Sequence, residues 1–441
     1  MEDVRLPFEV GVHFCNKGYD IIVSMRYLAI LGRQPEISIA ELEAQFADIE
    51  FSMDLSKILG RQTLTYVEFT TGSEVVIDRF GGLQKVAIRL NQKPLEYLQS
   101  LPEGKLTIGV SDFSSKASKR TAQNEALKLK KILVRHGRSV RVVENKDTVL
   151  STATTLHNGL SGKNERKIEL IKVNDDWHRV VGVQDIDAYT RRDQERPARD
   201  AKVGMLPPKL AQILINLCGP LPQGATVLDP FCGTGVVLQE ALLMGYKAYG
   251  TDISERMIEY SKKNLDWLMK SGEDSIRGIP EPGKARTSAG RPWQTAPWDA
   301  DDPKGRWAGR TRPENGSFQI SEGDATSFTW QQPIDAVACE GYLGKPMSVI
   351  PSDIKMKEQK QQCGAIILGF LKNLAKQIKT DTPVTIAAPA WLRSNGEYER
   401  LDIVDEIENM GYNVNNKTRE GLLYHRKDQI VARDIIILRK K

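Results

Sequence analysis

The chain has 441 residues, of which 27% are charged and 40% hydrophobic, and a formal net charge of +5. This length suits two or three domains, and the composition is normal for a soluble globular protein. No apolar run reaches the length of a membrane span, and the first ten residues lack a signal-peptide pattern, so we expect a cytoplasmic protein. The five cysteines are scattered and form no CxxC pair, which argues against a disulfide framework and against a metal site.

The pattern up to about residue 190 predicts a mixed region of helices and strands. Residues 25–46 predict a strand, a turn and a helix, with Ser38 as N-cap and Glu41 completing a capping box. A second helix is expected over 118–136, and Gly137 then stands where a helix end favours glycine. Apolar alternation predicts strands at 105–113, 139–144, 167–173 and 178–186.

Residues 191–208 are dense in charge and end in proline, which predicts a linker that runs over the surface. From residue 209 onward, apolar β-rich runs alternate with helical stretches. Such alternation indicates a parallel, doubly wound sheet, and ligands of such sheets bind at the carboxyl ends of the strands.

Residues 271–317 interrupt the alternation and predict an insertion. They contain thirteen glycines and prolines and no visible period. The segment is either a disordered loop or a loop that clamps unpaired bases, because tryptophan and arginine together stack on them. Its tryptophans are Trp293, Trp298 and Trp307.

The sharpest signal lies in TVLDPFCGTGVVLQEA, residues 226–241, where an apolar strand meets a glycine loop and then a helix that starts near Val236. Gly233 and Gly235 allow close backbone approach to a ligand, and the helix beyond them offers free N–H groups. The next apolar run, KAYGTDI, ends with Asp252, where an acidic side chain holds the ribose hydroxyls of a nucleoside cofactor.

Two other nucleotide sites compete with this interpretation. A dinucleotide fingerprint needs a third glycine, and Leu238 stands at that position. A phosphate loop of the GxxxxGK[ST] type is absent from the sequence.

The DPFCGTG loop resembles the first motif of S-adenosylmethionine-dependent methyltransferases that modify amino groups of nucleic-acid bases. The resemblance implies S-adenosyl-L-methionine as cofactor, with Asp229 and the glycine loop around its methionine part. Asp252 would hold the ribose, and Asp324 would contact the adenine amine. The alternative is three capping aspartates on a generic doubly wound sheet. The full set implied for cofactor binding is Asp229, Pro230, Phe231, Gly233, Gly235, Asp252, Ile253, Asp324 and Ala325.

Methyl transfer to a base amine needs an oxygen that accepts the amine hydrogens and an aromatic ring that stacks on the base. The family supplies both from Asp/Asn-Pro-Pro-Tyr/Phe after its fourth strand. Here Glu340 replaces the first residue, both prolines are missing, and Tyr342 comes one residue early. We assign Glu340 and Tyr342 as catalytic, and a relaxed site with altered or lost activity remains the alternative. Cys339 is either a nucleophile or a packing residue.

Four further segments resemble the THUMP-domain tRNA guanosine methyltransferases, which modify the guanine exocyclic amine. The resemblance implies a Rossmann-like class I methyltransferase domain at 209–441, preceded by an α+β THUMP-like RNA-binding region at 1–190. It implies tRNA or another structured RNA as partner, with a small activating protein as a further candidate and no membrane. The segments are 137–160, 183–193, 192–217 and 421–438.

A basic stripe supports an RNA partner independently of the resemblance. Between Lys116 and Arg141 there are nine Lys and Arg residues and one acidic residue, Glu125. Such a stripe neutralises phosphates, although charge runs are also common on solvated helix faces. The residues assigned to RNA binding are Lys130, Lys131, Arg138 and Arg141.

Three functions therefore stay open. The first is methylation of a guanosine amine in tRNA. The second is methylation of adenine or cytosine amines in DNA, which uses the same cofactor fold. The third is RNA binding without catalysis, which the departure at 340–344 supports.

Overall fold

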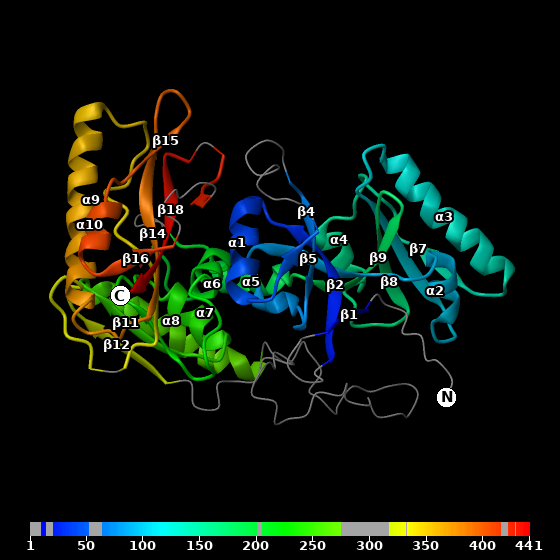
Figure 1. Cartoon of the computed structure of the whole chain (residues 1–441), viewed down its shortest axis with the longest axis horizontal. Coiled ribbons are helices and arrows are strands. Elements are labelled where there is room, and N and C mark those ends of the chain that lie inside the picture. The colour runs from blue at the N-terminus through cyan, green and yellow to red at the C-terminus, as the bar shows by residue number, and fades with distance from the viewer. Residues whose placement is uncertain are drawn as a thin grey trace. The chain divides into compact units, whose positions relative to one another are not determined.

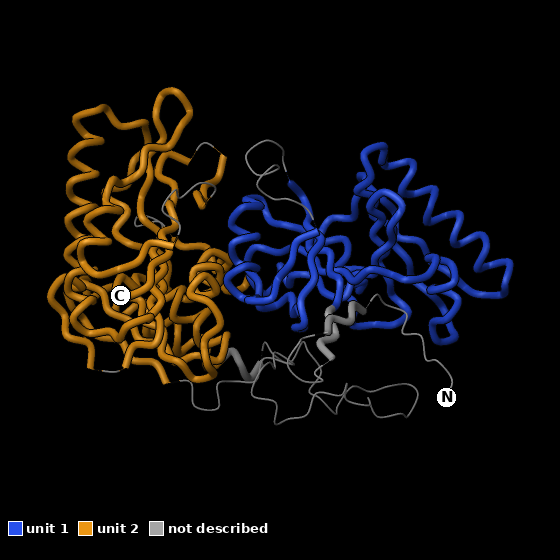
Figure 2. Tube along the Cα trace, viewed as in Figure 1, with its two compact units in different colours: residues 1–189 blue, residues 190–441 orange. Residues whose placement is uncertain are grey.

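A computed structural model of the chain describes residues 10–14, 21–52, 64–200, 205–274, 317–331, 333–415, 422–427 and 429–441. The chain divides into two compact units, residues 1–189 and residues 190–441 (Figure 2). Among the helices in these ranges, none is both long enough and apolar enough to cross a membrane.

Unit 1 is built on a nine-stranded sheet in the order β3-β4-β2-β5-β9-β8-β6-β7, with β1 paired to β2. β6 runs parallel to β7 and β8, and the other pairs are antiparallel. This confirms the predicted α+β character and the four predicted strands. The strands are β1 (Val10–Phe14), β2 (Ile21–Leu31), β3 (Glu50–Phe51), β4 (Tyr66–Thr71), β5 (Leu83–Arg89), β6 (Leu106–Asp112), β7 (Val140–Val142), β8 (Lys167–Val173) and β9 (Asp176–Val183).

The first helix of unit 1 starts earlier than its sequence predicts. α1 spans Pro35–Gln45, so Ser38 and Glu41 lie inside the helix, and the predicted capping box is wrong. The Ser38 hydroxyl donates to the carbonyl of Gly82 at 2.7 Å, and the Glu41 carboxylate accepts from the amides of Gly81 and Gly82. Tertiary partners take these polar groups because both side chains are buried against that turn.

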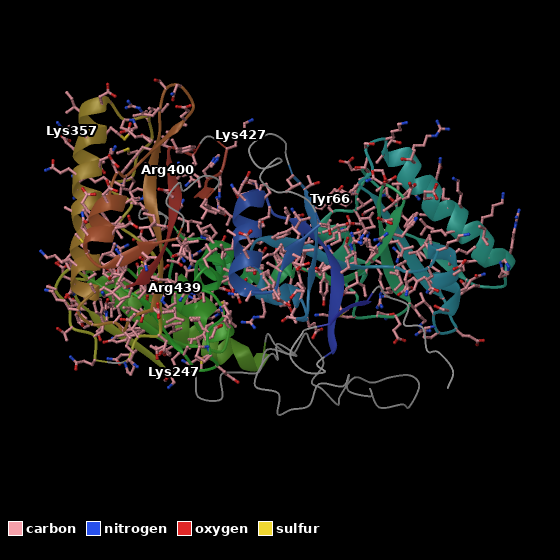
Figure 3. All side chains as sticks on the ribbon, in the orientation of Figure 1. Tyr66, Lys247, Lys357, Arg400, Lys427 and Arg439 are labelled. Carbon is pink, nitrogen blue, oxygen red and sulfur yellow. The ribbon has the colours of Figure 1, made fainter. Side chains whose placement is uncertain are left out.

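The second predicted helix is confirmed as α3 (Lys119–Arg135), which contacts β6 and β7. Ser118 caps it, and Thr121 completes a capping box. Ala122, Ala126, Leu129 and Leu133 form its buried face. Figure 3 shows nitrogen-tipped side chains along the opposite side of α3. The other helices of unit 1 are α2 (Pro94–Ser100) and α4 (Thr152–His157), and α5 (Ile186–Gln194) crosses into unit 2.

Unit 2 contains a second sheet in the order β12-β11-β10-β13-β14-β18-β16. The first five strands in this order are parallel, and β18 runs antiparallel between β14 and β16. From β10 the chain first adds β11 and β12 on one side of the sheet and then adds β13 and β14 on the other side. This change of direction confirms the Rossmann-like class I methyltransferase fold. The strands are β10 (Thr226–Asp229), β11 (Lys247–Asp252), β12 (Phe318–Glu322), β13 (Ala336–Glu340), β14 (Pro383–Leu392), β15 (Tyr398–Arg400), β16 (Tyr412–Val414), β17 (Leu423–Tyr424) and β18 (Val431–Lys440).

Helices cover both faces of this sheet (Figure 1). α6, α7 and α8 contact the central strands, and α9 contacts β14 and α10. Burial of Phe370, Ile386, Trp391 and Ile436 between α9 and the sheet forms the main core of the unit. The helices are α6 (Pro208–Asn216), α7 (Val236–Leu243), α8 (Glu255–Asp274), α9 (Asp353–Leu374) and α10 (Val404–Asn409).

The segment before α6 is not the surface linker that its charge predicts. Arg192, Arg196 and Asp200 are all less than 10% exposed. Arg192 pairs with Glu240 at 2.6 Å, and both main-chain groups of Ala198 bond to the Asn264 amide. Ion pairs within unit 2 and a side-chain clamp therefore hold this charged segment against α7 and α8.

Candidate active site

A cavity of about 720 Å³ opens in unit 2 where β10, β11 and β13 end. This is the switch point of the sheet, at which ligands of such folds bind. Its wall includes all the residues predicted for the cofactor and for catalysis except Gly235. These wall residues are Asp229, Pro230, Phe231, Gly233, Asp252, Ile253, Asp324, Ala325, Glu340 and Tyr342.

The glycine loop adopts the backbone that its sequence predicts. Gly233 and Gly235 have φ of 50° and 80°, in the left-handed region where only glycine is free of strain. Gly235 is the N-cap residue of α7, and a Cβ there would lie 3.0 Å from the Ser261 hydroxyl oxygen. Its role in this structure is close packing against α8, which corrects its assignment as a cavity residue.

Asp252 joins the ends of two neighbouring strands. Its carboxylate accepts from the amide of Gly233 and from the amide of Ser254, each at 2.9 Å. The side chain is half-buried and lines the cavity. Two amides therefore fix the orientation of a carboxylate that still has acceptor capacity toward the cavity.

Asp229 stands at the floor of the cavity and is 2% exposed. Burial raises its pKa well above the usual range, and the nearby charges of Asp252 and Glu340 raise it further, against one amide bond from Phe231. Burial likewise raises the pKa of Asp252. The cavity is thus a desolvated, acidic site that favours a cationic ligand.

The third strand end supplies a more open wall. Asp324 is exposed, and its Oδ1 accepts from the amide and the hydroxyl of Thr326 at 2.9 and 2.7 Å. Ala325 is buried beside it. Ile253 is 71% exposed although it is a large apolar residue, so an uncovered apolar surface faces this end of the cavity. Such a surface suits a flat heterocycle.

Glu340 has a partner that sequence reasoning missed. Nε of Arg433, on β18, donates to Oε1 of Glu340 at 2.8 Å, and the two side chains are 9% and 17% exposed. Oε2 makes no hydrogen bond within the described part of the chain. Arg433 lies beside Glu340 because β18 pairs antiparallel with β14, which in turn pairs with β13. The signal in the sequence was the charge in the apolar run ARDIIIL.

The loop after β13 is ordered despite its unusual sequence. The amide of Gly341 donates to the carbonyl of Ala387 at 3.0 Å, which extends the ladder between β13 and β14. Tyr342 is half-buried, packs against the main core and lines the cavity. Gly344 has φ of 85°, and the Gln359 side chain bonds to the next amide. A carboxylate and an aromatic ring are therefore held at one wall of the cavity.

Cys339 does not behave as a nucleophile. It is fully buried on β13, and burial raises the pKa of its thiol well above the usual range, assisted by the charge of Asp229. The thiolate is the reactive form, so this cysteine is a packing residue.

Two residues of the cavity wall, Asp200 and Leu206, lie in the segment 191–208 that was predicted to be a linker. No sequence motif indicated a role for either of them. Asp200 is 6% exposed and accepts a hydrogen bond from the Arg256 guanidinium, and Leu206 lies further along the wall. The insertion at 271–317, with Trp293, Trp298 and Trp307, lies outside the described residues except at its two ends. Within the described ranges, no three His, Cys, Asp or Glu side chains are grouped to hold a metal ion.

Comparison with known proteins identifies relatives of this site. Residues 116–263 match a family model described as DNA methylase. A tRNA (guanine(10)-N2)-dimethyltransferase of Methanothermobacter thermautotrophicus is 50% identical over 62 residues, which are 14% of this chain and 18% of that protein. The protein of the same name from Pyrococcus abyssi is 42% identical over 85 residues, which are 18% of this chain and 25% of that protein. The chain is related to the tRNA guanosine amino-methyltransferases.

The relationship confirms the predicted resemblance and the predicted cofactor, S-adenosyl-L-methionine. The matches span no more than a quarter of either relative. The crystal structure of TrmN from Thermus thermophilus aligns with 95% of this chain and 100% of that chain, at 15% identity and a TM-score of 0.40.

Proposed function

We propose that this chain is an S-adenosylmethionine-dependent RNA methyltransferase that methylates the exocyclic amine of a guanosine in tRNA. One observation carries the proposal: the three predicted aspartates, Glu340 and Tyr342 line a single cavity at the switch point of the sheet. A carboxylate for a ribose, a carboxylate for an amine and an aromatic ring for a base are what this transfer needs from a protein.

The cavity residues fit the cofactor. When bound, the cofactor supplies an electrophilic methyl group on a sulfonium cation. Asp229 is desolvated beside two other carboxylates, so a cation in the cavity offsets their mutual repulsion. Asp252 would hold the ribose, and Ile253 and Asp324 would face the adenine.

The acceptor side depends on Glu340 and Tyr342. Arg433 occupies one oxygen of Glu340, so the other oxygen can accept a hydrogen from a base amine. Tyr342 would stack on the base. Accepting that hydrogen would direct the nitrogen lone pair toward the methyl group that the cofactor supplies, and the proton that the amine loses on methylation would pass to the accepting oxygen of Glu340.

Acid should weaken cofactor binding. Burial and neighbouring charge raise the pKa of Asp229 and of Asp252, and a bound cation favours their ionised forms, so binding releases protons. The affinity for S-adenosylmethionine should be constant at pH values above the raised pKa values of Asp229 and Asp252. It should fall as the pH drops through those pKa values. Calorimetric titrations from about pH 8 to about pH 5 would measure this. S-adenosylhomocysteine, a neutral thioether, is the matched control, and an equal pH dependence for both ligands would contradict the argument.

We also propose that unit 1 is a THUMP-like RNA-binding region in a cytoplasmic enzyme. On and beside α3, Lys116, Lys119, Arg120, Lys128, Lys131, Arg135 and Arg141 are exposed. Arg138 differs from them, because its guanidinium donates to the main-chain carbonyls of Leu98, Leu101, Pro102 and Gly104. Arg138 therefore secures the fold of unit 1, which corrects its assignment to RNA contact.

Charge reversal on α3 should weaken RNA affinity. Replacing Lys130 and Lys131 with glutamate should lower tRNA affinity about 10-fold and flatten the salt dependence by about two charges, since each lost phosphate contact releases one fewer counterion. Filter binding over a range of salt concentrations would measure the slope. Lys372→Glu, an exposed change on α9, is the matched control. An unaltered slope in the α3 double variant would place the RNA elsewhere.

The DNA methylase description of the matching family model favours a second candidate, a DNA amino-methyltransferase. Mass spectrometry of nucleosides separates the two. Purified tRNA and duplex DNA would each be incubated with the protein and cofactor carrying a labelled methyl group. We expect labelled N2-methylguanosine from tRNA and none from DNA. Label in DNA alone would favour the second candidate, and cofactor binding without label in either would favour RNA binding without catalysis.

A further inference from the structure

Three large apolar side chains of unit 2 are exposed within one short segment. Val349, Ile350 and Ile354 are 70%, 43% and 76% exposed, and they lie between the cavity wall and the first turn of α9. They are three of the six large apolar side chains that are exposed in the described ranges. Single exposed apolar residues are common on protein surfaces, whereas a group of them in one place indicates an interaction surface.

The loop that carries these side chains is anchored on both sides. Met347 packs against the main core of unit 2, and Pro351 is buried. Ser352 is the N-cap of α9, so Pro351 and Met356 occupy the two positions of a hydrophobic staple, and Met356 is 2% exposed. The amide of Met356 donates to the carbonyl of Ser352 at 2.8 Å. The apolar side chains are therefore exposed on a loop whose other apolar residues are packed.

Lysines surround the apolar group and give it a positive charge. Three of them are exposed and make no ion pair with any described residue. Asp353 is neutralised by Nη1 of Arg393 at 2.6 Å, so Glu358 is the one acidic residue in 345–358 that opposes the lysines. A surface that is both apolar and positive matches a nucleic-acid strand, which offers base faces and phosphates together. The lysines are Lys345, Lys355 and Lys357, the last of which is labelled in Figure 3.

This segment adjoins the acceptor wall of the cavity. Residues 340–344 line the cavity, and Lys345 follows them directly. α9 returns to the same cavity at Ala365. Ile354 precedes Ala365 by 11 residues, which is about 16 Å along a helix. The apolar group therefore lies within a few nucleotides of a base that is held at the acceptor wall.

We propose that Val349, Ile350 and Ile354, here called the apolar wedge, insert between stacked bases of the RNA beside the nucleotide that is methylated, while the three lysines bind the flanking phosphates. The proposal rests on the RNA methylation proposed above. A base amine in folded RNA enters a protein cavity only after its nucleotide has left the stack. Apolar side chains that fill the vacated space offset part of the cost of unstacking. The basic stripe on α3 then contributes affinity, and the apolar wedge gives the base access to the cavity.

The test uses a fluorescent base to detect unstacking. The tRNA would carry 2-aminopurine beside the methylated guanosine, whose position the mass spectrometry described above provides. This base is quenched within a stack and brightens when its neighbour leaves. The wild-type chain should raise the fluorescence several-fold. The variant Val349→Ser/Ile350→Ser/Ile354→Ser should leave the fluorescence near that of free tRNA, even when protein saturates the tRNA. Its methylation rate should fall about 10- to 100-fold, because the cost of unstacking is no longer offset.

Salt dependence separates the apolar wedge from the lysines. The serine variant should bind tRNA more weakly with an unaltered salt slope, since apolar contacts release no counterions. Replacing the three lysines with glutamine should also weaken binding, but should flatten the slope by about three charges. The matched control replaces Lys372, Lys376 and Lys379, exposed near the other end of α9, with glutamine and should leave affinity and slope unchanged. All three variants should bind S-adenosylhomocysteine as the wild type does.

The outcomes decide between the apolar wedge and other roles for the surface. An equal rise in fluorescence with the wild type and the serine variant would overturn the proposal. Loss of self-association in sedimentation experiments, without a change in fluorescence, would assign the surface to a second copy of the chain instead. If the wild-type chain methylates no tRNA, the proposed function fails. A lower tRNA affinity of the serine variant at an unaltered slope would then still support the apolar contact, and an equal affinity would overturn it.

Discussion

Glu340→Gln is expected to lower the rate of methyl transfer about 100- to 1,000-fold, and to lower cofactor affinity much less. Arg433 donates to one oxygen of the Glu340 carboxylate. In the variant, the amide oxygen would take that place, and the amide NH₂ would face the cavity. The amide NH₂, a hydrogen-bond donor, would then face the base amine, whereas methyl transfer needs a hydrogen-bond acceptor at that position.

Single-turnover kinetics with labelled cofactor and excess tRNA would measure the chemical step, and calorimetry would measure cofactor affinity. Glu358→Gln, an exposed change on α9, is the matched control and should leave both quantities unchanged. Arg433→Met should lower the rate as well, because the Glu340 carboxylate loses the hydrogen bond that fixes its orientation. Full turnover by Glu340→Gln would remove Glu340 from the mechanism.

Asp252→Ala is expected to weaken cofactor binding about 100-fold or more. The carboxylate would hold the ribose hydroxyls through charge-assisted bonds, each of which contributes about 1.5–3 kcal/mol. The change also frees the amides of Gly233 and Ser254, so the glycine loop loses its attachment to the end of β11. Calorimetry with S-adenosylhomocysteine would measure the affinity.

Two comparisons separate ribose binding from loop support in that variant. Asp252→Asn keeps one acceptor for an amide and should recover part of the affinity. Glu255→Ala, an exposed residue three positions later, should bind as wild type does. Wild-type affinity in Asp252→Ala would show that the ribose lies elsewhere in the cavity.

Much of the site could be predicted because its residues stand at strand ends. Asp229, Asp252 and Glu340 are the last residues of β10, β11 and β13. Parallel strands end at one edge of a sheet, so apolar runs that stop at a carboxylate bring those carboxylates together. The glycine loop could also be predicted from the sequence, because the positive φ values at Gly233 and Gly235 favour glycine at these positions.

The residues that sequence reasoning missed depend on tertiary pairing. Arg433 reaches Glu340 only because β18 enters the sheet antiparallel beside β14. Arg196 and Asp200 lie in a charged segment, and charge alone predicts exposure. Ser38 fits an N-cap in the sequence, yet the carbonyl of Gly82, far along the chain, takes its hydroxyl. Local patterns specify elements, whereas partners distant in the chain decide where polar groups lie.

The carboxylate that ties Gly233 to Ser254 has a consequence for mutation. One side chain holds two loops and, in the function proposed here, would also bind the ribose, so mutation at position 252 would change rigidity and affinity together. Glu340 is held differently, from outside the cavity by an arginine on another strand. A change at Arg433 would therefore alter the proposed acceptor side without breaking the two amide bonds of Asp252.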